Sequence, residues 1–122
     1  QDAEAIASLS RLGVSVCLVD EPRLPGLMQF SSALTGDIAY MRFHGRNAKK
    51  WYDHDKPHER YDYRYSSEEL TKFTQPILEM SEKARDTLVF FNNHYGAQAV
   101  DNARELATML GIGKKPRQGR LF

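Results

Sequence analysis

Two short apolar runs in this chain end directly in polar residues that can carry chemistry, and this feature constrains the fold most. Residues 38–43 read Ile-Ala-Tyr-Met-Arg-Phe and lead into His44, while residues 87–91 read Thr-Leu-Val-Phe-Phe and lead into Asn92. Short runs rich in apolar and aromatic residues are typical of buried β-strands. If the two strands are parallel, their carboxyl ends meet at one edge of the sheet, where such folds gather their binding sites.

The rest of the chain alternates helical and strand patterns, which predicts an α/β fold with parallel strands and covering helices. Residues 14–19 form a third apolar run, rich in Val, of the kind found in strands that are buried on both faces. Apolar residues at helical spacing predict helices over residues 2–12 and 96–110, each ended by a glycine. We expect one domain over residues 1–122, with a basic tail at 113–122.

A further helix begins with a capping pattern. Ser66 and Glu69 have the spacing at which each side chain satisfies the backbone N–H of the other. Leu70 and Phe73 then follow on one face of the predicted helix. Pro76 has no backbone donor, so we expect it to kink this helix or to end its regular part.

The composition is that of a globular protein with no membrane span. Of the 122 residues, 41% are hydrophobic and 27% are charged, and no apolar run approaches the roughly 18 residues that cross a bilayer. The acidic start, Gln1-Asp2-Ala3-Glu4, is unlike a signal peptide. The single cysteine, Cys17, lies inside an apolar run, which favours a buried core residue over a reactive thiol. Because no intrachain disulfide can form, we expect a cytoplasmic location.

Basic residues are concentrated at the C-terminal end. The net charge is +1, and the last nine residues contain no acidic residue and four basic ones, Lys114, Lys115, Arg117 and Arg120. The rest of the chain is therefore slightly acidic, which argues against a basic nucleic-acid platform. The tail could contact phosphate, or it is simply a solvated terminus.

His44 is the candidate catalytic residue, because it lies where a predicted strand meets its loop and histidine can move a proton near neutral pH. Arg42 precedes it on the same face of the strand, where a guanidinium can bind an anion. Arg46 either reaches the same ligand or faces solvent. Asp20 ends the first predicted strand at the same edge of the sheet. In a purely structural alternative, Arg42 makes ion pairs within the fold and His44 bonds a neighbouring loop.

Three further candidates follow the last predicted strand. Asn92 and Asn93 point to opposite faces, so we expect one to face the pocket and the other to bond loop backbone. His94 lies at the start of the last predicted helix, whose free N–H groups favour an anion.

The segment 45–65 is long and polar, yet it carries five aromatic residues, including Trp51 and Tyr65. Loops of this length without regular structure are uncommon unless they are functional or disordered, and disordered segments are poor in aromatics. Three interpretations stay open: the rings stack on a sugar or base, the segment is a lid that excludes water, or the rings pack the segment onto the fold.

A metal site is a weaker alternative. Oxygen and nitrogen ligands could come from Asp20, Glu21, His44, Asn92 and His94, which together suit a mixed site. No recognised metal-binding spacing supports it, so we predict no metal ligands, and the sequence names no cofactor.

Several ordered motifs together resemble the YecE-like family, known as domain of unknown function 72. They are Tyr40-Met-Arg-Phe-His-Gly-Arg46, Trp51-Tyr52, Tyr65-Ser-Ser-Glu-Glu-Leu70, Phe90-Phe-Asn-Asn-His94, Ala99-Val-Asp-Asn-Ala103 and Arg117-Gln-Gly-Arg-Leu-Phe122. The family is similar to (β/α)₈ barrels and its chains are about twice as long. The resemblance implies that this chain is the C-terminal part of such a barrel, with about three strands. An incomplete barrel needs a partner: a missing N-terminal half or a second copy of itself.

The resemblance brings no established activity, so three hypotheses remain. The first is an enzyme with a phosphorylated or otherwise anionic substrate, in which Arg42 and Arg46 bind the anion and His44 moves a proton. The second is a nucleic-acid binding protein that uses the aromatic segment and the basic tail. The third is a non-catalytic half-domain that needs a partner. No Ser-His-Asp order, phosphate-loop glycine motif or matched carboxylate pair names a reaction.

Overall fold

Three parallel strands form the centre of the protein in a computed structural model, which describes residues 3–24, 33–93 and 95–112. The strands are β1 (Cys17–Asp20), β2 (Ile38–Phe43) and β3 (Asp86–Phe91), and they lie side by side in the order β1-β2-β3. The register pairs Asp20 with Phe43 and Phe43 with Phe91, so all three strands end at the same edge. The predicted parallel arrangement is confirmed.

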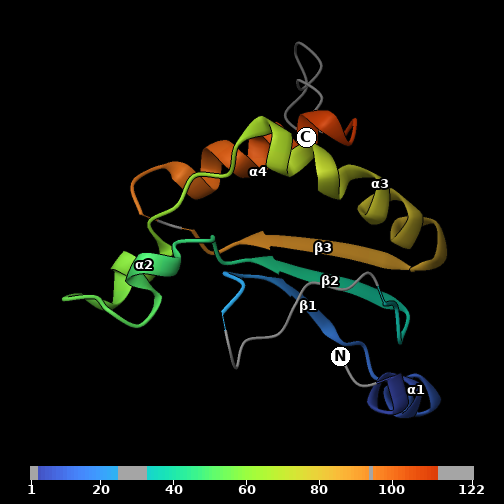
Figure 1. Cartoon of the computed structure of the whole chain (residues 1–122). Coiled ribbons are helices and arrows are strands. Elements are labelled where there is room, and N and C mark those ends of the chain that lie inside the picture. Colours follow the sequence, from blue (N-terminus) through green and yellow to red (C-terminus); the bar gives the residue numbers. More distant parts are fainter. Residues whose placement is uncertain (1–2, 25–32, 94, 113–122) are drawn as a thin grey trace, which may run out of the picture.

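One face of the sheet is covered and the other is open. Helices α3 (Ser67–Lys83) and α4 (Gln98–Met109) both lie over the same face (Figure 1). The core between them and the sheet includes Met41, Phe43 and Leu70, all of which are fully buried. On the opposite face, where no described helix packs, Leu88 and Phe90 are 41% and 46% exposed. Burial of the first strand on both faces was therefore a wrong expectation, since only alternate residues of β1 are buried.

Helix α3 begins as the sequence predicts. Ser66 Oγ accepts a hydrogen bond from the backbone N–H of Glu69, and the Glu69 carboxylate accepts one from the N–H of Ser66. The helix then runs through Pro76 to Lys83, so the proline does not end it. Four apolar side chains along one face, Leu70, Phe73, Ile77 and Met80, are buried against the sheet. Their burial outweighs the loss of one backbone hydrogen bond at Pro76.

The last helix starts later than the helical pattern suggested, at Gln98. Gly96 adopts φ +62°, a left-handed conformation that cannot continue into a right-handed helix. The buried residues of α4 are Asn102 and Leu106, whereas Val100 is 52% exposed. At its end, Gly111 adopts φ +77°, as expected of a glycine that stops a helix.

The segment 45–65 contains two short helices that its composition did not reveal. They are α2 (Ala48–Trp51), capped by Asn47, and the 3₁₀-helix η1 (Pro57–Tyr61). Both lie beyond the carboxyl ends of the strands, and α2 marks that end of the sheet in Figure 1. A long structureless loop is therefore not present there.

Helix α1 (Ala3–Leu12) lies at the opposite end, near the start of the strands, and none of its side chains is buried. It confirms the helix predicted for this region, although Leu12 is 75% exposed. No described helix is both long and apolar enough to cross a membrane. The basic tail at 113–122 lies outside the described residues.

Candidate functional site

A buried carboxylate organises the edge where the strands end. Asp20, at the end of β1, is 4% exposed. Arg46 donates two hydrogen bonds to it, from Nε to Oδ2 at 2.9 Å and from Nη2 to Oδ1 at 2.8 Å. This paired geometry is the strong form of a guanidinium–carboxylate contact. Hydrogen bonding to Asp20 accordingly raises the pKa of Arg46.

Glu69 completes the neutralisation of Arg46. Its Oε2 lies 3.2 Å from Arg46 Nη1, and the guanidinium also lies over the rings of Tyr65 and Phe73. Arg46 was expected either to reach an anionic ligand or to face solvent. The structure instead places it between two carboxylates, where it joins β1 to the start of α3.

Two tyrosines extend this network. Tyr65 donates to Asp20 Oδ2 at 2.7 Å and accepts from the backbone N–H of Gly45 at 2.9 Å. Tyr63 donates to Glu69 Oε2 at 2.6 Å. Burial, followed by the charge of Asp20, raises the pKa of Tyr65. Burial, followed by the bond to Glu69, raises the pKa of Tyr63 to about 12. Both phenols therefore act as neutral donors.

The pKa of Glu69 reflects opposing effects. Burial acts to raise it, but the Ser66 N–H, the Tyr63 hydroxyl and the Arg46 charge together hold it below its usual value. The carboxylate is therefore ionised throughout the neutral range, as a partner for Arg46 requires.

Asn93 lies on the helix-covered side and is fully buried. Its Nδ2 donates to the carbonyl oxygen of Tyr63 and to Asn102 Oδ1. Asn102 in turn accepts from the N–H of Tyr65 and donates to its carbonyl oxygen, each at 3.0 Å. Asn93 therefore bonds loop backbone, which is one of the two roles expected for this pair of asparagines.

His44 lies on the other side of the sheet edge, among aromatic rings. Its backbone N–H donates to the carbonyl oxygen of Asp20. Its ring centroid lies 6.5 Å from that of Trp51 and 5.9 Å from that of Tyr61. Its Nδ1 is buried and has no hydrogen-bond partner among the described residues. Burial first, and then the charge of Arg42, lower the pKa of the imidazole, while Asp20 partly offsets this effect. The ring is therefore neutral at pH 7 and able to accept a proton.

Arg42 and Asn92 share this open side with His44. Arg42 alternates with the buried Met41 and Phe43 along β2, which places it on the open face. It makes no ion pair with any residue in the described part of the chain. The backbone N–H of Asn92 donates to the carbonyl oxygen of Phe43, so the ladder continues past the strand and brings position 92 beside position 44. We call the set Arg42, His44 and Asn92 the open-face cluster.

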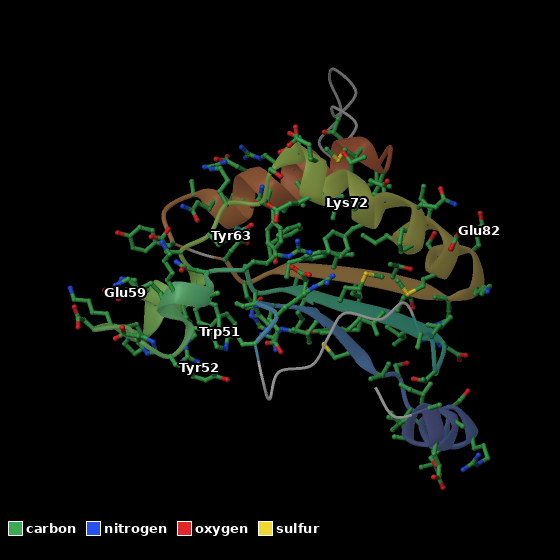
Figure 2. All side chains as sticks on the ribbon, in the orientation of Figure 1. Trp51, Tyr52, Glu59, Tyr63, Lys72 and Glu82 are labelled. Carbon is green, nitrogen blue, oxygen red and sulfur yellow. The ribbon has the colours of Figure 1, made fainter. Side chains whose placement is uncertain are left out.

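Trp51 forms a wall for this cluster and is 5% exposed. Trp51 is the last residue of α2, and Figure 2 shows it at the lower side of this helix, at the strand-end side of the sheet, with Tyr52 next to it. Arg60 lies over the Trp51 ring at 5.6 Å, and its Nε is a second buried nitrogen without a partner among the described residues. The sequence does not point to Arg60, because its position beside Trp51 depends on the short helix η1.

The burial of Trp51 and Tyr65 helps to choose among the three interpretations of the aromatic segment 45–65. Both rings pack into the protein, while Tyr52 is 66% exposed. For these two side chains, the interpretation that the rings pack the segment onto the fold therefore applies. His94 lies outside the described residues. Among those that are described, no group of three His, Cys, Asp or Glu side chains could hold a metal ion.

Comparison with known proteins adds a family match. The family model described as a protein of unknown function, DUF72, matches residues 1–120. The UPF0759 protein YunF of Bacillus subtilis is 34% identical over an alignment of 120 residues, and the match covers 88% of this chain and 41% of YunF.

Two solved structures of DUF72 family proteins are similar in fold. The one from Thermotoga maritima has a TM-score of 0.85 and 41% identity, over 91% of this chain and 42% of that protein. The one from Enterococcus faecalis has a TM-score of 0.82 and 29% identity, over 96% of this chain and 45% of that protein. The chain thus spans less than half the length of these relatives.

Proposed function

The chain belongs to the DUF72 family, and from that premise we propose that it carries a binding site for a small anionic ligand at the open-face cluster. The observation that supports this proposal is the pairing of Arg42, which no described carboxylate neutralises, with His44, whose buried Nδ1 has no hydrogen-bond partner in the described part of the chain. A buried nitrogen left without a hydrogen bond costs about 1–3 kcal/mol. A ligand that bonds to it recovers that free energy.

Each residue of the cluster has a distinct role in this proposal. Arg42 supplies a fixed, planar pair of donors for a carboxylate or phosphate group. His44 is neutral, because burial and Arg42 lower its pKa, and it takes a proton from the bound molecule. The amide of Asn92 donates and accepts beside it. Trp51 and Tyr61 exclude water from the imidazole, which strengthens every electrostatic contact there.

We also propose that the chain is the C-terminal part of a (β/α)₈ barrel in a cytoplasmic protein. The exposure of Leu88 and Phe90 on the open face supports this proposal, since barrel-interior side chains are covered when the barrel closes. The outer edges of β1 and β3 pair with no described strand, and unpaired parallel edges are a liability unless another strand covers them. The catalytic position in such barrels is the carboxyl end of the strands, where the open-face cluster lies.

Equilibrium dialysis tests the ligand proposal. The full-length protein, of which this chain is a part in the barrel proposal, is dialysed against a panel of phosphorylated and carboxylated metabolites. The retention of each compound is measured by mass spectrometry. We expect at least one compound to be retained and its affinity to fall tenfold or more in Arg42→Gln. His44→Gln should also weaken binding of that compound, because the hydrogen bond to the imidazole is lost. Arg85→Gln, which removes an exposed surface pair with Asp86, serves as the matched control.

Two outcomes would refute this proposal. One is that no compound on the panel is retained. The other is that Arg42→Gln and Arg85→Gln bind equally well.

The barrel proposal has its own test. The 122-residue chain alone should associate in a concentration-dependent way in sedimentation and bind a hydrophobic dye on its open face. The full-length protein should do neither. A chain that stays monomeric and binds no dye would contradict the proposal.

A further inference from the structure

A polar cavity of about 330 Å³ lies between α2, η1 and the turn that precedes α4. None of the residues that line it belongs to the open-face cluster or its aromatic wall. Asn47 and Lys50 line it at α2, and Lys56 and His58 line it at the start of η1. Tyr95 lines the opposite side, from the turn before α4. We propose that this cavity binds the phosphate group of a small molecule.

The walls of the cavity are fixed before any ligand arrives. Asn47 Nδ2 donates to the carbonyl oxygen of Asp62 at 2.8 Å, and its Oδ1 accepts from the N–H of Lys50. Across the cavity, the rings of His58 and Tyr95 stack with centroids 5.4 Å apart and planes inclined by 13°. This stack joins η1 to the turn before α4, so His58 and Lys56 are presented from an anchored segment. A preformed site loses less entropy on binding.

The cavity is lined by two lysines and two carboxylates, and one of the lysines has no carboxylate partner among the described residues. Lys56 makes no ion pair with any described residue, and Lys50 is half exposed, with its Nζ at 3.7 Å from Glu59 Oε2. Such an exposed, long pair contributes little, so the Lys50 ammonium can turn toward a ligand.

The two carboxylates at the cavity already have other partners. Glu59 Oε2 accepts from the N–H of Asp55 at 3.1 Å, and Asp62 Oδ1 accepts from Gln98 Nε2 at 3.2 Å. Both carboxylates keep their charge. The groups that can donate to a phosphate are therefore the Lys56 ammonium, the His58 imidazole and, once it turns from Glu59, the Lys50 ammonium.

Phosphate is the chemical group that fits this set best. Lysine binds phosphate as a point charge that can approach from several directions, and the imidazole of His58 adds a hydrogen-bond donor. The volume exceeds that of a lone phosphate and leaves room for an attached organic group. Glu59 and Asp62 then lie where hydroxyl groups of that organic part can donate to them.

Histidine NMR tests this proposal in the full protein. The ring signals are assigned with His58→Gln and His44→Gln, and inorganic phosphate is added at constant ionic strength, with chloride as the reference salt. We expect the His58 signal to shift saturably with phosphate and not with chloride. A sugar phosphate should compete at a lower concentration than inorganic phosphate.

Matched variants locate the binding site. Lys56→Gln should weaken phosphate binding at least fivefold, and the double variant Lys50→Gln, Lys56→Gln should abolish it. Lys72→Gln changes the same residue type on the exposed surface of α3, away from the cavity (Figure 2), and should leave the affinity unchanged.

The His44 signal separates this inference from the proposed function, because it reports on the open-face cluster alone. Phosphate shifts confined to His44, a linear non-saturating response at His58, or equal affinities for Lys56→Gln and Lys72→Gln would each overturn the inference. If His58 responds and His44 does not, the second site stands independently of the first.

Discussion

Tyr65 and Asp20 lie 45 positions apart in the chain, yet the tyrosine hydroxyl donates to the buried carboxylate at 2.7 Å. The same hydroxyl oxygen accepts from the N–H of Gly45. One phenol therefore joins the end of β1, the loop after β2 and the approach to α3. His44 precedes Gly45 directly, so this contact fixes the backbone from which the imidazole projects.

Removal of that hydroxyl should destabilise the protein. Tyr65→Phe keeps the ring packing but leaves the N–H of Gly45 and one bond of Asp20 unsatisfied in a buried place. We expect a loss of about 1–3 kcal/mol in the free energy of unfolding, measured by urea denaturation. Tyr52→Phe, at a ring that is 66% exposed, is the matched control. Equal stability of the two variants would contradict the role given to Tyr65.

Arg46 should tolerate no replacement, including lysine. Arg46→Gln leaves the Asp20 carboxylate buried without its cationic partner, which costs about 3–5 kcal/mol. Arg46→Lys restores the charge but not the two parallel hydrogen bonds, so its stability should fall between that of Arg46→Gln and the original protein. Urea denaturation at pH 7 measures both. If Arg46→Lys unfolds at the same urea concentration as the original protein, the paired geometry does not matter.

Gly45 combines a positive φ with a close contact, so it should be more sensitive to substitution than Gly111. It adopts φ +92°, and a Cβ at this position would lie 2.8 Å from the Cβ of Tyr63. Gly111 also has a positive φ, of +77°, but a Cβ there would meet nothing within 4 Å. Gly111→Ala should therefore show the conformational cost alone, about 1–2 kcal/mol. Gly45→Ala should lower the thermal midpoint clearly further, because the loop must also move away from Tyr63.

The stability of the protein should depend on His44 below neutral pH. Its pKa lies below the ordinary 6.5 in the folded state, so the unfolded chain takes up a proton first as the pH falls. The stabilisation that comes from neutral His44 is therefore fully present above about pH 6.5. It declines as the pH falls below that value, and it stops declining once the pH is below the pKa of His44 in the folded protein. The slope cannot exceed about 1.4 kcal/mol per pH unit for one proton.

His44→Gln tests this pH dependence. The variant should show a flatter stability profile between pH 6.5 and pH 4.5, measured by urea denaturation at each pH. His58→Gln, at an exposed histidine, provides the comparison. A slope that is identical in His44→Gln and the original protein would rule out His44 as its origin.

Much of the fold could be predicted from local patterns. The capping spacing of Ser66 and Glu69 located the start of α3, and the runs at 38–43 and 87–91 located two parallel strands. Local patterns failed where tertiary contacts decide the outcome. Helix α3 continues past Pro76 because its apolar face is buried on the sheet, and η1 forms in a segment whose residues show no helical period.

The candidate site was predictable as a location but not as a set of contacts. The sequence placed His44, Asp20 and Asn93 at one edge, since all three follow or end strands. It could not show that the buried Asp20 neutralises Arg46, because the pairing depends on which side of the sheet each side chain takes. Alternation along β1 puts Asp20 on the helix-covered side, whereas Arg42 faces the other side. Arg42 rather than Arg46 is therefore the available cation.

The bond between Asn102 and the backbone of Tyr65 has a consequence for the dynamics of the molecule. One side-chain amide satisfies both the N–H and the C=O of a residue outside any strand, as an adjacent β-chain would. The Tyr65 amide hydrogen should accordingly exchange with solvent on the timescale of the sheet interior. Helix α4 and the approach to α3 would then open together, as a single cooperative unit.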